Sequence, residues 1–386
     1  MRSNYKPIGE LVTRIDERNT DGEATELIGV SIDKCFIKSV ANTIGTDLTK
    51  YKIIRKDDFA VSLMQVSRDS KIPVARQTEY DIAIMSPAYP IFRVTDKNVI
   101  LPEYLDMWFK RSEFDREAAF IAVGGVRGSM PWDEFAQMEV HVPDIETQKK
   151  IVHDYQIIEE RIELKKKIND NLVAQAQTYF NSLFTIEGTT LPDGWKTAIV
   201  GDYCSDNIAN ISKADSFETI LYLDTGSVTQ NYISTLQELN LAIDDIPSRA
   251  KRKVSDGDIV FSTVRPNLRH YALIQNPPFN LIASTGFAVL NNKGLGVSNE
   301  LIFMWLTKDS ILEYLQAIAE NSVSTYPSLN VSDLLNVEII VPDDSTLHNA
   351  NNYLKAIFSA IDANNNQVKA LLDMQSILLQ KLLSSC

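Results

Sequence analysis

Apolar residues recur with alternating spacings of four and three over two long stretches of the chain, residues 145–186 and 343–386. A period of 3.5 residues kept over about five heptads predicts two long helices that pack knobs into holes. Since neither apolar seam could remain in water, we expect the helices to pair as an antiparallel coiled coil. The seam positions expected at their contact are Ile151, Tyr155, Ile158, Ile162, Leu172, Leu354, Ile357, Ile361, Leu371 and Leu378.

Polar residues interrupt both seams, at Lys165, Asn169, Asn364 and Gln375. A buried polar residue in such a seam lowers stability but fixes the register and the choice of partner. This pattern favours one defined helix pair. The alternative is that each helix packs only against its own globular domain.

The segments outside the two helices mix strand and helix patterns. Residues 253–264 and 280–290 are rich in β-branched and aromatic residues and are bounded by turn residues, so they predict strands. Residues 298–320 predict one helix, with Ser298 as its N-cap. Residues 187–195 contain two glycines and a proline and predict a linker.

The two halves of the chain repeat each other. Residues 140–144 (VHVPD) recur as 339–343 (IIVPD), an offset of 199 residues. Further pairs in the same order and at a similar offset are 130–140 with 329–339, 105–109 with 302–306, 57–62 with 257–262, and 5–11 with 195–203. A constant order at a nearly constant offset indicates an internal duplication.

This duplication predicts an α+β chain in which two mixed α/β domains in tandem alternate with two long helices. The length of 386 residues fits two or three structural units. The predicted boundaries are 1–144 for the first domain, 145–186 for the central helix, 187–342 for the second domain and 343–386 for the C-terminal helix.

Composition narrows the chemistry. The three cysteines lie far apart and the four histidines lack metal-ligand spacing, so we expect no disulfide, no metal and no cofactor in this chain. No apolar run approaches the ~20 residues that cross a bilayer. The first residues lack the apolar core of a signal peptide, so we expect a cytoplasmic protein without membrane contact.

The net charge of −13 argues against a free-standing DNA-binding protein, which usually carries a positive surplus. The distribution of charge matters more than its sum, however. Basic residues cluster at equivalent places in the two halves, near residues 50–56 and 249–253. This recurrence favours a role in DNA binding.

Several segments resemble the specificity subunits of type I restriction–modification enzymes, and the resemblance covers essentially the whole chain. The segments are Gly194 to Asp202 (GW-K…GD), 257–269 (GDIVFSTVRPNLR), 283–290 (ASTGFAVL), 57–69 (DDFAVSLMQVSRD), 85–94 (MSPAYPIFRV) and the VPD before each long helix. The second half departs from the family pattern, because DDSTLHNANN stands where a Glu-Gln pair is common. That departure weakens the comparison at the start of the second helix only.

The resemblance implies a non-catalytic subunit with two target-recognition domains, which together recognise an asymmetric, bipartite sequence in double-stranded DNA. It implies that the helices dock two modification subunits, which bind S-adenosylmethionine and methylate adenine N6. A restriction subunit is a further partner that the resemblance allows. The partners would supply much of the grip on phosphates, which accommodates the acidic net charge.

Candidate DNA contacts follow the strands of the GDIVFS type, where polar and basic side chains could reach base edges. They are Ser67, Arg68, Asp69 and Lys71 in the first domain and Thr263, Arg265, Asn267 and Arg269 in the second. Arg127 in the GGVRGSM loop is another candidate. Candidate phosphate contacts are Lys52, Arg55, Lys251, Arg252 and Lys253.

Two other functions remain open at this point. Residues 276–279 (NPPF) match the target-base motif of DNA adenine-N6 methyltransferases. That chemistry also needs a glycine-rich S-adenosylmethionine loop after a strand, which neither domain offers, so we expect NPPF to form a turn. The third possibility, a coiled-coil scaffold without a DNA role, leaves two large and unlike domains unexplained.

Overall fold

The computed structural model describes residues 4–39, 45–64, 66–125, 128–185, 190–212, 214–322 and 326–381. Contacts divide the chain into two compact units, Met1–Leu164 with Val368–Cys386 (unit 1) and Lys165–Gln367 (unit 2). The long helices α6 (Ile145–Phe184) and α11 (Asp344–Lys381) each contribute to both units. In the described residues, no helix combines the length and the apolar character needed to span a membrane.

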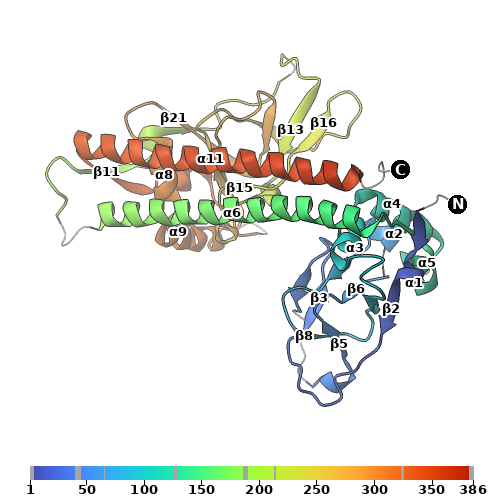
Figure 1. Ribbon diagram of the computed structural model, residues 1–386. Helices are drawn as coiled ribbons and strands as arrows, with labels where there is room; N and C mark the ends of the chain where they lie inside the picture. Colours follow the sequence, from blue (N-terminus) through green and yellow to red (C-terminus); the bar gives the residue numbers. More distant parts are fainter. Residues whose placement is uncertain are drawn as a thin grey trace. The chain divides into compact units, whose positions relative to one another are not determined.

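In the part of unit 1 that the structure describes, a four-stranded antiparallel sheet in the order β2-β9-β6-β7 is accompanied by three smaller strand pairs, β1-β10, β3-β4 and β5-β8. Its elements are β1 (Tyr5–Pro7), α1 (Ile8–Leu11), β2 (Val12–Ile15), β3 (Ile28–Val30), β4 (Phe36–Lys38), β5 (Lys52–Arg55), β6 (Phe59–Val61), α2 (Val66–Asp69), β7 (Val74–Arg76), β8 (Ile82–Met85), β9 (Ile91–Val94), α3 (Pro102–Phe109), α4 (Ser112–Ile121), α5 (Trp132–Gln137) and β10 (Glu139–His141). Helix α6 follows β10 along the chain after three residues. It runs as one continuous helix (Figure 1).

The described residues of unit 2 form two four-stranded sheets, in the orders β12-β21-β18-β19 and β16-β13-β20-β17, and the strand pairs β11-β22 and β14-β15. Its elements are β11 (Lys196–Ile199), α7 (Val200–Tyr203), β12 (Cys204–Asp206), β13 (Thr219–Leu223), β14 (Val228–Thr229), β15 (Tyr232–Ile233), β16 (Gln237–Asn240), β17 (Ala250–Lys253), β18 (Ile259–Ser262), the 3-10 turn η5 (Pro266–Leu268), β19 (Tyr271–Leu273), β20 (Leu281–Ser284), β21 (Phe287–Asn292), α8 (Asn299–Leu306), α9 (Asp309–Glu320), α10 (Val331–Leu335) and β22 (Glu338–Val341).

The two units share one topology, and this confirms the duplication. The sheet order β2-β9-β6-β7 of unit 1 corresponds to β12-β21-β18-β19 of unit 2, strand for strand along the chain. The pair β5-β8 corresponds to β17-β20, and both pairs are antiparallel. Helices α3, α4 and α5 correspond to α8, α9 and α10. The predicted α+β fold, with two sheet-bearing domains and two long helices, is therefore confirmed.

Residues 298–320 form two helices where the sequence predicted one. Ser298 caps the first helix as predicted, because its Oγ accepts a hydrogen bond from the Leu301 backbone N–H at 3.2 Å. Helix α8 is buried on all sides, whereas α9 buries only one face, so a straight continuation could not satisfy both environments. The chain turns at Thr307 and Lys308, and Lys308 has an extended backbone.

Each predicted strand segment also divides. Residues 253–264 contain the end of β17, a turn and β18, and residues 280–290 contain β20, a two-residue turn and most of β21. The two strands of each segment belong to different sheets. The sequence pattern does not reveal this change of sheet, because β20 and β21 are both buried and their residues read as one continuous apolar run.

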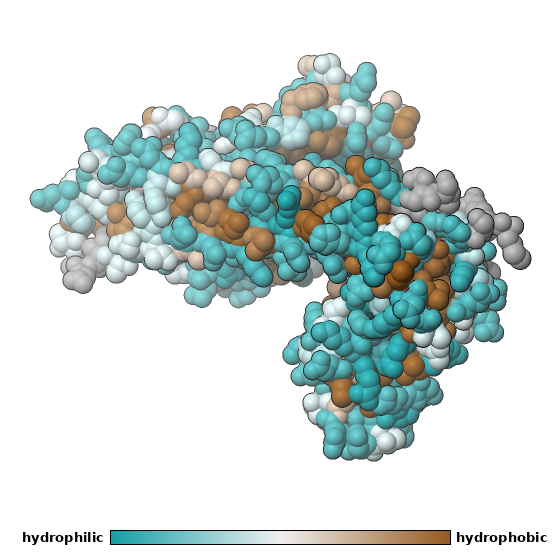
Figure 2. Space-filling model, in the orientation of Figure 1, coloured by the Kyte–Doolittle hydropathy of each residue, from teal (hydrophilic) through white to brown (hydrophobic). Residues whose placement is uncertain are grey.

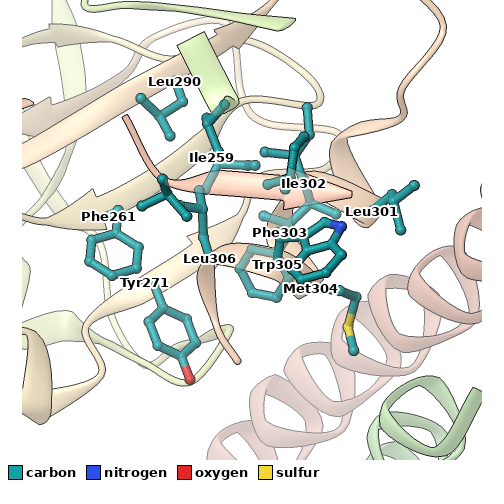
Figure 3. Packing of buried hydrophobic residues seen from close by; sticks show 14 of the residues in the cluster. Ile259, Phe261, Tyr271, Leu290, Leu301, Ile302, Phe303, Met304, Trp305 and Leu306 are labelled. Atoms are coloured by element: carbon teal, nitrogen blue, oxygen red, sulfur yellow. The ribbon is translucent and has the colours of Figure 1, made fainter. Parts of the chain in front are cut away.

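Helix α8 forms the centre of the unit 2 core. Figure 3 shows its side chains among those of Ile259, Phe261, Tyr271 and Leu290 from the adjacent sheet. On the other side, the Trp305 ring lies 5.0 Å from that of Phe180 on α6, centroid to centroid. The apolar face of α6 is therefore part of the core of this unit.

The two long helices pack antiparallel, as predicted. In unit 2, Phe180 of α6 and Leu354 of α11 share one core, and in unit 1, Ile151 and Leu378 pack against another. All ten predicted seam positions are buried or half-buried: Ile151, Tyr155, Ile158, Ile162, Leu172, Leu354, Ile357, Ile361, Leu371 and Leu378. The seam contact thus explains the 3.5-residue period of both segments.

Polar residues join the helices near the middle of the pair. The Lys165 Nζ donates to Asn364 Oδ1 at 2.9 Å, Asn364 Nδ2 donates to Asn169 Oδ1 at 3.0 Å, and Asn169 Nδ2 donates to Asn365 Oδ1 at 2.8 Å. Lys165 and Asn364 are 199 residues apart, which is the offset of the duplication. The polar layer therefore joins two equivalent positions of the repeat.

His141 is a buried titratable group in unit 1. It is 1 % exposed, and its ring centroid lies 5.2 Å from that of Tyr5. Neither ring nitrogen has a hydrogen-bond partner in the described part of the chain. Burial, and then the nearby charge of Arg111, lower the pKa of His141 below its ordinary value of 6.5.

We expect acid to destabilise unit 1 through His141. The unfolded chain binds a proton at higher pH than the folded chain does, so this contribution is complete above pH about 6.5 and is lost as the pH falls below that value. The variant His141→Leu should therefore show a smaller loss of stability between pH about 7.5 and about 5.5, measured as the urea midpoint. An unchanged pH dependence in this variant would contradict the assignment.

Candidate nucleic-acid interface

The candidate base contacts lie on one structural feature that occurs in both units. We call residues 62–73 and 263–270 the recognition loops, because they carry the candidate base contacts. Each connects two adjacent strands of a four-stranded sheet, β6 to β7 and β18 to β19. Each loop accepts a backbone hydrogen bond from the segment that precedes a short helix, α5 in unit 1 and α10 in unit 2. The Met130 N–H donates to the Leu63 carbonyl at 2.9 Å, and the Leu329 N–H donates to the Thr263 carbonyl at 2.7 Å.

The recognition loop of unit 2 holds two arginines in a strained conformation. Arg265 and Arg269 have φ of +50° and +57°, the left-handed region that bulky residues rarely adopt. The Arg265 guanidinium lies 5.2 Å from the centroid of the Tyr326 ring, and Arg269 Nη2 pairs with Asp309 Oδ1 at 2.8 Å. Such strain persists only where the surroundings fix the backbone, and it concentrates at functional sites.

Two other candidates in this loop differ in exposure. Asn267 is exposed, and its side chain is accessible to a ligand. Thr263 is half-buried, and its Oγ1 and backbone N–H both donate to the Gly286 carbonyl, at 3.2 and 3.0 Å. Thr263 therefore holds the loop to the sheet, and the exposed side chains Arg265 and Asn267 are the stronger candidates for base contacts.

The recognition loop of unit 1 contains the short helix α2. Arg68 is exposed and pairs with the neighbouring Asp69 at 2.9 Å, and Lys71 is exposed. The GGVRGSM loop approaches closely, because a Cβ on Gly128 would lie 2.4 Å from Ser67 Oγ. The structure thus brings Gly128 of this loop against the recognition loop, whereas Arg127 lies outside the described residues.

Lys52 was predicted to contact a phosphate, and the structure contradicts this prediction. Its side chain is buried, its Nζ donates to the Tyr89 carbonyl at 3.0 Å, and burial lowers its pKa. We withdraw it as a phosphate contact, because an ammonium group bound inside the domain cannot reach a duplex. Arg55 is half-exposed and pairs with Glu17.

The candidate phosphate contacts of the second domain, Lys251, Arg252 and Lys253, lie on β17 and differ in their exposure to solvent. Lys251 is exposed, whereas Arg252 is half-buried and burial lowers its pKa. The Lys253 ammonium pairs with Asp215 and holds the pKa of that carboxyl below its ordinary range. Lys251 is therefore the member of this cluster with the freest access to a phosphate.

Apolar side chains at the recognition loops were missed by the sequence reasoning. Met64 is 57 % exposed and Val264 is 36 % exposed, and they occupy equivalent positions 200 residues apart. Leu268 within the loop of unit 2 and Tyr326 beside Arg265 are also exposed. Aligning residues 57–62 with 257–262 and continuing by two residues would have found the first pair. Exposed apolar groups of this kind suit contact with thymine methyl groups.

The NPPF segment forms a turn between β19 and β20, as expected. Asn276 donates its amide to Asp362 of α11 at 3.0 Å, and its backbone N–H is bound by Asp256 at 2.7 Å. Phe279 is 86 % exposed, and its ring lies tilted at 5.8 Å from that of Phe217, centroid to centroid. In the described residues of unit 2, β13-β20 is the one parallel strand pair, so the parallel sheet that a methyltransferase domain requires is not built there. The structure does not favour the methyltransferase alternative.

Comparisons with known proteins agree with the family resemblance. No protein-family model matches the chain. The chain is 28 % identical over 152 residues to the type I restriction enzyme HindI specificity subunit of Haemophilus influenzae, covering 39 % of this chain and 32 % of that protein. It is 24 % identical over 315 residues to the MjaIX specificity subunit of Methanocaldococcus jannaschii, covering 75 % and 70 %.

The fold also has a solved counterpart. The crystal structure of a type I restriction–modification S subunit from M. genitalium matches with a TM-score of 0.58 at 12 % identity, covering 98 % of this chain and 95 % of that one. The chain spans about a third of the length of the HindI subunit that it matches. The resemblance inferred from the sequence is confirmed, and the solved structure supports the shared fold.

Proposed function

We propose that this chain is the DNA-recognition subunit of a type I restriction–modification enzyme. The observation that carries the proposal is the pair of recognition loops, which occupy the same topological position in two duplicated units but differ in sequence. Two unlike loops of this kind would recognise two unlike half-sites, giving an asymmetric, bipartite target. The recognition domains would comprise residues 1–144 and 187–342, and the helical regions 145–186 and 343–386.

The exposed loop side chains supply suitable chemistry for bases. Arginine binds guanine O6 and N7, and asparagine pairs with adenine N6 and N7. Arg265 and Asn267 in unit 2, and Arg68 and Lys71 in unit 1, are exposed donors of this kind. The exposed Lys251 would contact a phosphate and add affinity without sequence information.

The long helices offer a surface for the modification subunits. Helix α6 exposes a second set of apolar residues outside the seam, Ile157, Leu164 and Ile168, and Leu164 is 58 % exposed. On α11, Leu372, Met374 and Ile377 are also exposed. Figure 2 shows apolar surface along these two helices. A further helix from a partner would cover such a stripe.

In this proposal the chain catalyses no reaction itself. Two modification subunits would bind S-adenosylmethionine and methylate adenine N6 in the target, and a restriction subunit would be a further partner, in the cytoplasm. The acidic net charge of −13 fits a subunit whose partners supply much of the contact to phosphates. The chain alone should neither bind nor consume S-adenosylmethionine.

Methylation-sensitive sequencing tests this function directly. A host that expresses the chain with its modification partner should gain N6-methyladenine at one bipartite sequence, and the partner alone should not add it. Methylation by the chain without a partner would instead support the methyltransferase alternative. Absence of sequence-dependent DNA binding by the complete complex would leave the scaffold alternative.

Replacing Arg265 should weaken recognition of one half-site. We expect Arg265→Ala to reduce the affinity of the complex for its target about 10-fold, because one base contact of this type contributes about 1–3 kcal/mol. Lys293→Ala is the matched control, since Lys293 follows the opposite end of the same sheet. Fluorescence anisotropy with target duplexes measures both variants. Equal losses for the two variants would refute a role for Arg265 in recognition.

A further inference from the structure

Each recognition loop is fastened by a side chain from the helix that packs against it. In unit 2, the Asn267 backbone N–H donates to Gln316 Oε1 of α9 at 3.1 Å. In unit 1, the Ile72 backbone N–H donates to Asp115 Oδ1 of α4 at 3.1 Å. Helices α4 and α9 are equivalent elements of the duplication, so both units use the same helix to hold the loop.

The two fastening residues are not equivalent in sequence. Helix α4 begins at Ser112 and α9 begins at Asp309, an offset of 197 residues. Asp115 therefore corresponds to Leu312, and Gln316 corresponds to Ala119. The two side chains lie one helical turn apart on equivalent helices, and they hold different loop positions, because Ile72 precedes β7 by two residues and Asn267 precedes β19 by four. Each unit therefore holds its loop with a side chain of its own.

The unit 2 loop needs such a contact because of its backbone. Gln316 binds the N–H of Asn267, which lies between Arg265 and Arg269, the two residues with positive φ. Asp309 of the same helix pairs with Arg269 at 2.8 Å. Without these partners the loop could relax toward ordinary dihedrals and would turn Arg265 and Asn267 away from their present directions.

In unit 1, Asp115 is itself fixed by a buried ion pair. Lys34 Nζ lies 2.8 Å from Asp115 Oδ1, with the two side chains 6 % and 13 % exposed. The Lys34 ammonium also donates to the Phe109 carbonyl. Lys34 lies in the turn between β3 and β4. Asp115 on α4 therefore contacts both the β3-β4 hairpin and the recognition loop.

We propose that Gln316 and Asp115 are positioning residues that determine the sequence discrimination of their own half-sites without touching DNA. The inference rests on the proposed function. Because each residue acts within one unit, loss of Gln316 should affect the half-site recognised by unit 2 and should leave the other half-site as an internal control. Contacts to phosphates, and hence the dependence of affinity on salt, should not change.

The test uses the chain in complex with its modification partner and labelled duplexes that carry the sequenced target or a single changed base pair in either half. Arg265→Ala identifies the half-site of unit 2. We expect Gln316→Leu to reduce discrimination in that half about five-fold, the loss of one hydrogen bond, with less than about two-fold change in the other half. Glu313→Leu, at an exposed position of the same helix, should change neither.

A rescue variant separates positioning from general damage. Gln316 Nε2 donates to Glu320 Oε1 at 2.8 Å, so the double substitution Gln316→Glu with Glu320→Gln keeps both an oxygen for Asn267 and an amide–carboxylate pair. It should restore discrimination. Equal losses in both half-sites, or unchanged discrimination in Gln316→Leu, would overturn the inference. A native complex without any sequence preference would instead overturn the proposed function.

Discussion

Replacing Asn364 by lysine should lower the free energy of unfolding by about 3 kcal/mol, since it sets two ammonium groups against each other in the helix seam. Asn364 is buried and accepts the hydrogen bond of Lys165 at 2.9 Å. The substitution removes that acceptor and replaces the amide that donates to Asn169 Oδ1 by a second ammonium group. Urea unfolding followed by the helical circular dichroism signal measures the loss, and Gln367→Lys, at an exposed position of the same helix, is the control.

The double substitution Lys165→Asn with Asn364→Lys should recover most of that loss. The two positions are separated by the repeat offset of 199 and are hydrogen-bonded to each other, so exchanging their residues keeps one lysine and one asparagine in contact. We expect stability within about 1 kcal/mol of the native chain. If the double variant is as unstable as Asn364→Lys, the equivalence of the two positions is wrong.

Replacing Phe180 by alanine should cost about 4 kcal/mol in unit 2. Phe180 is 2 % exposed, and its ring lies 4.8 Å from Phe184 and 5.0 Å from Trp305, centroid to centroid. Truncation would leave a cavity between α6 and α8, which the surrounding rings could fill only partly. The measurement is again the urea transition, together with Trp fluorescence, because Trp305 borders the new cavity.

Phe279 provides the matched control in the same unit. It is 86 % exposed on the NPPF turn, so Phe279→Ala should change stability by less than about 0.5 kcal/mol. Similar losses for the two phenylalanines would mean that α6 is not part of the unit 2 core. A large loss for Phe180 alone would show that the long helix stabilises the unit on which it packs.

The spacing of residues along the chain was enough to predict the elements that depend on local sequence patterns. The heptad pattern located both long helices, and the polar interruptions at Lys165 and Asn364 predicted one defined pair. The recurring segments predicted two units of one topology, and Ser298 predicted the start of α8. These features depend on side-chain periodicity and capping, which operate over a few residues and are therefore visible in sequence.

Exposure and long-range contacts required the tertiary structure. The sequence predicted that Lys52 contacts a phosphate. In the fold its side chain is buried and donates to the carbonyl of Tyr89, 37 residues further along the chain. The change of sheet within residues 280–290 depends on which strands lie alongside, not on the local pattern.

The sequence by itself determined the duplicated plan of this protein, its two helices and the location of the recognition loops. Only the tertiary structure decided which loop side chains face solvent and which residues hold the loops in place. Gln316 lies 49 residues from Asn267, and Asp115 lies 43 residues from Ile72. No periodicity relates such pairs, because a hydrogen bond between distant segments depends on how the chain folds back on itself.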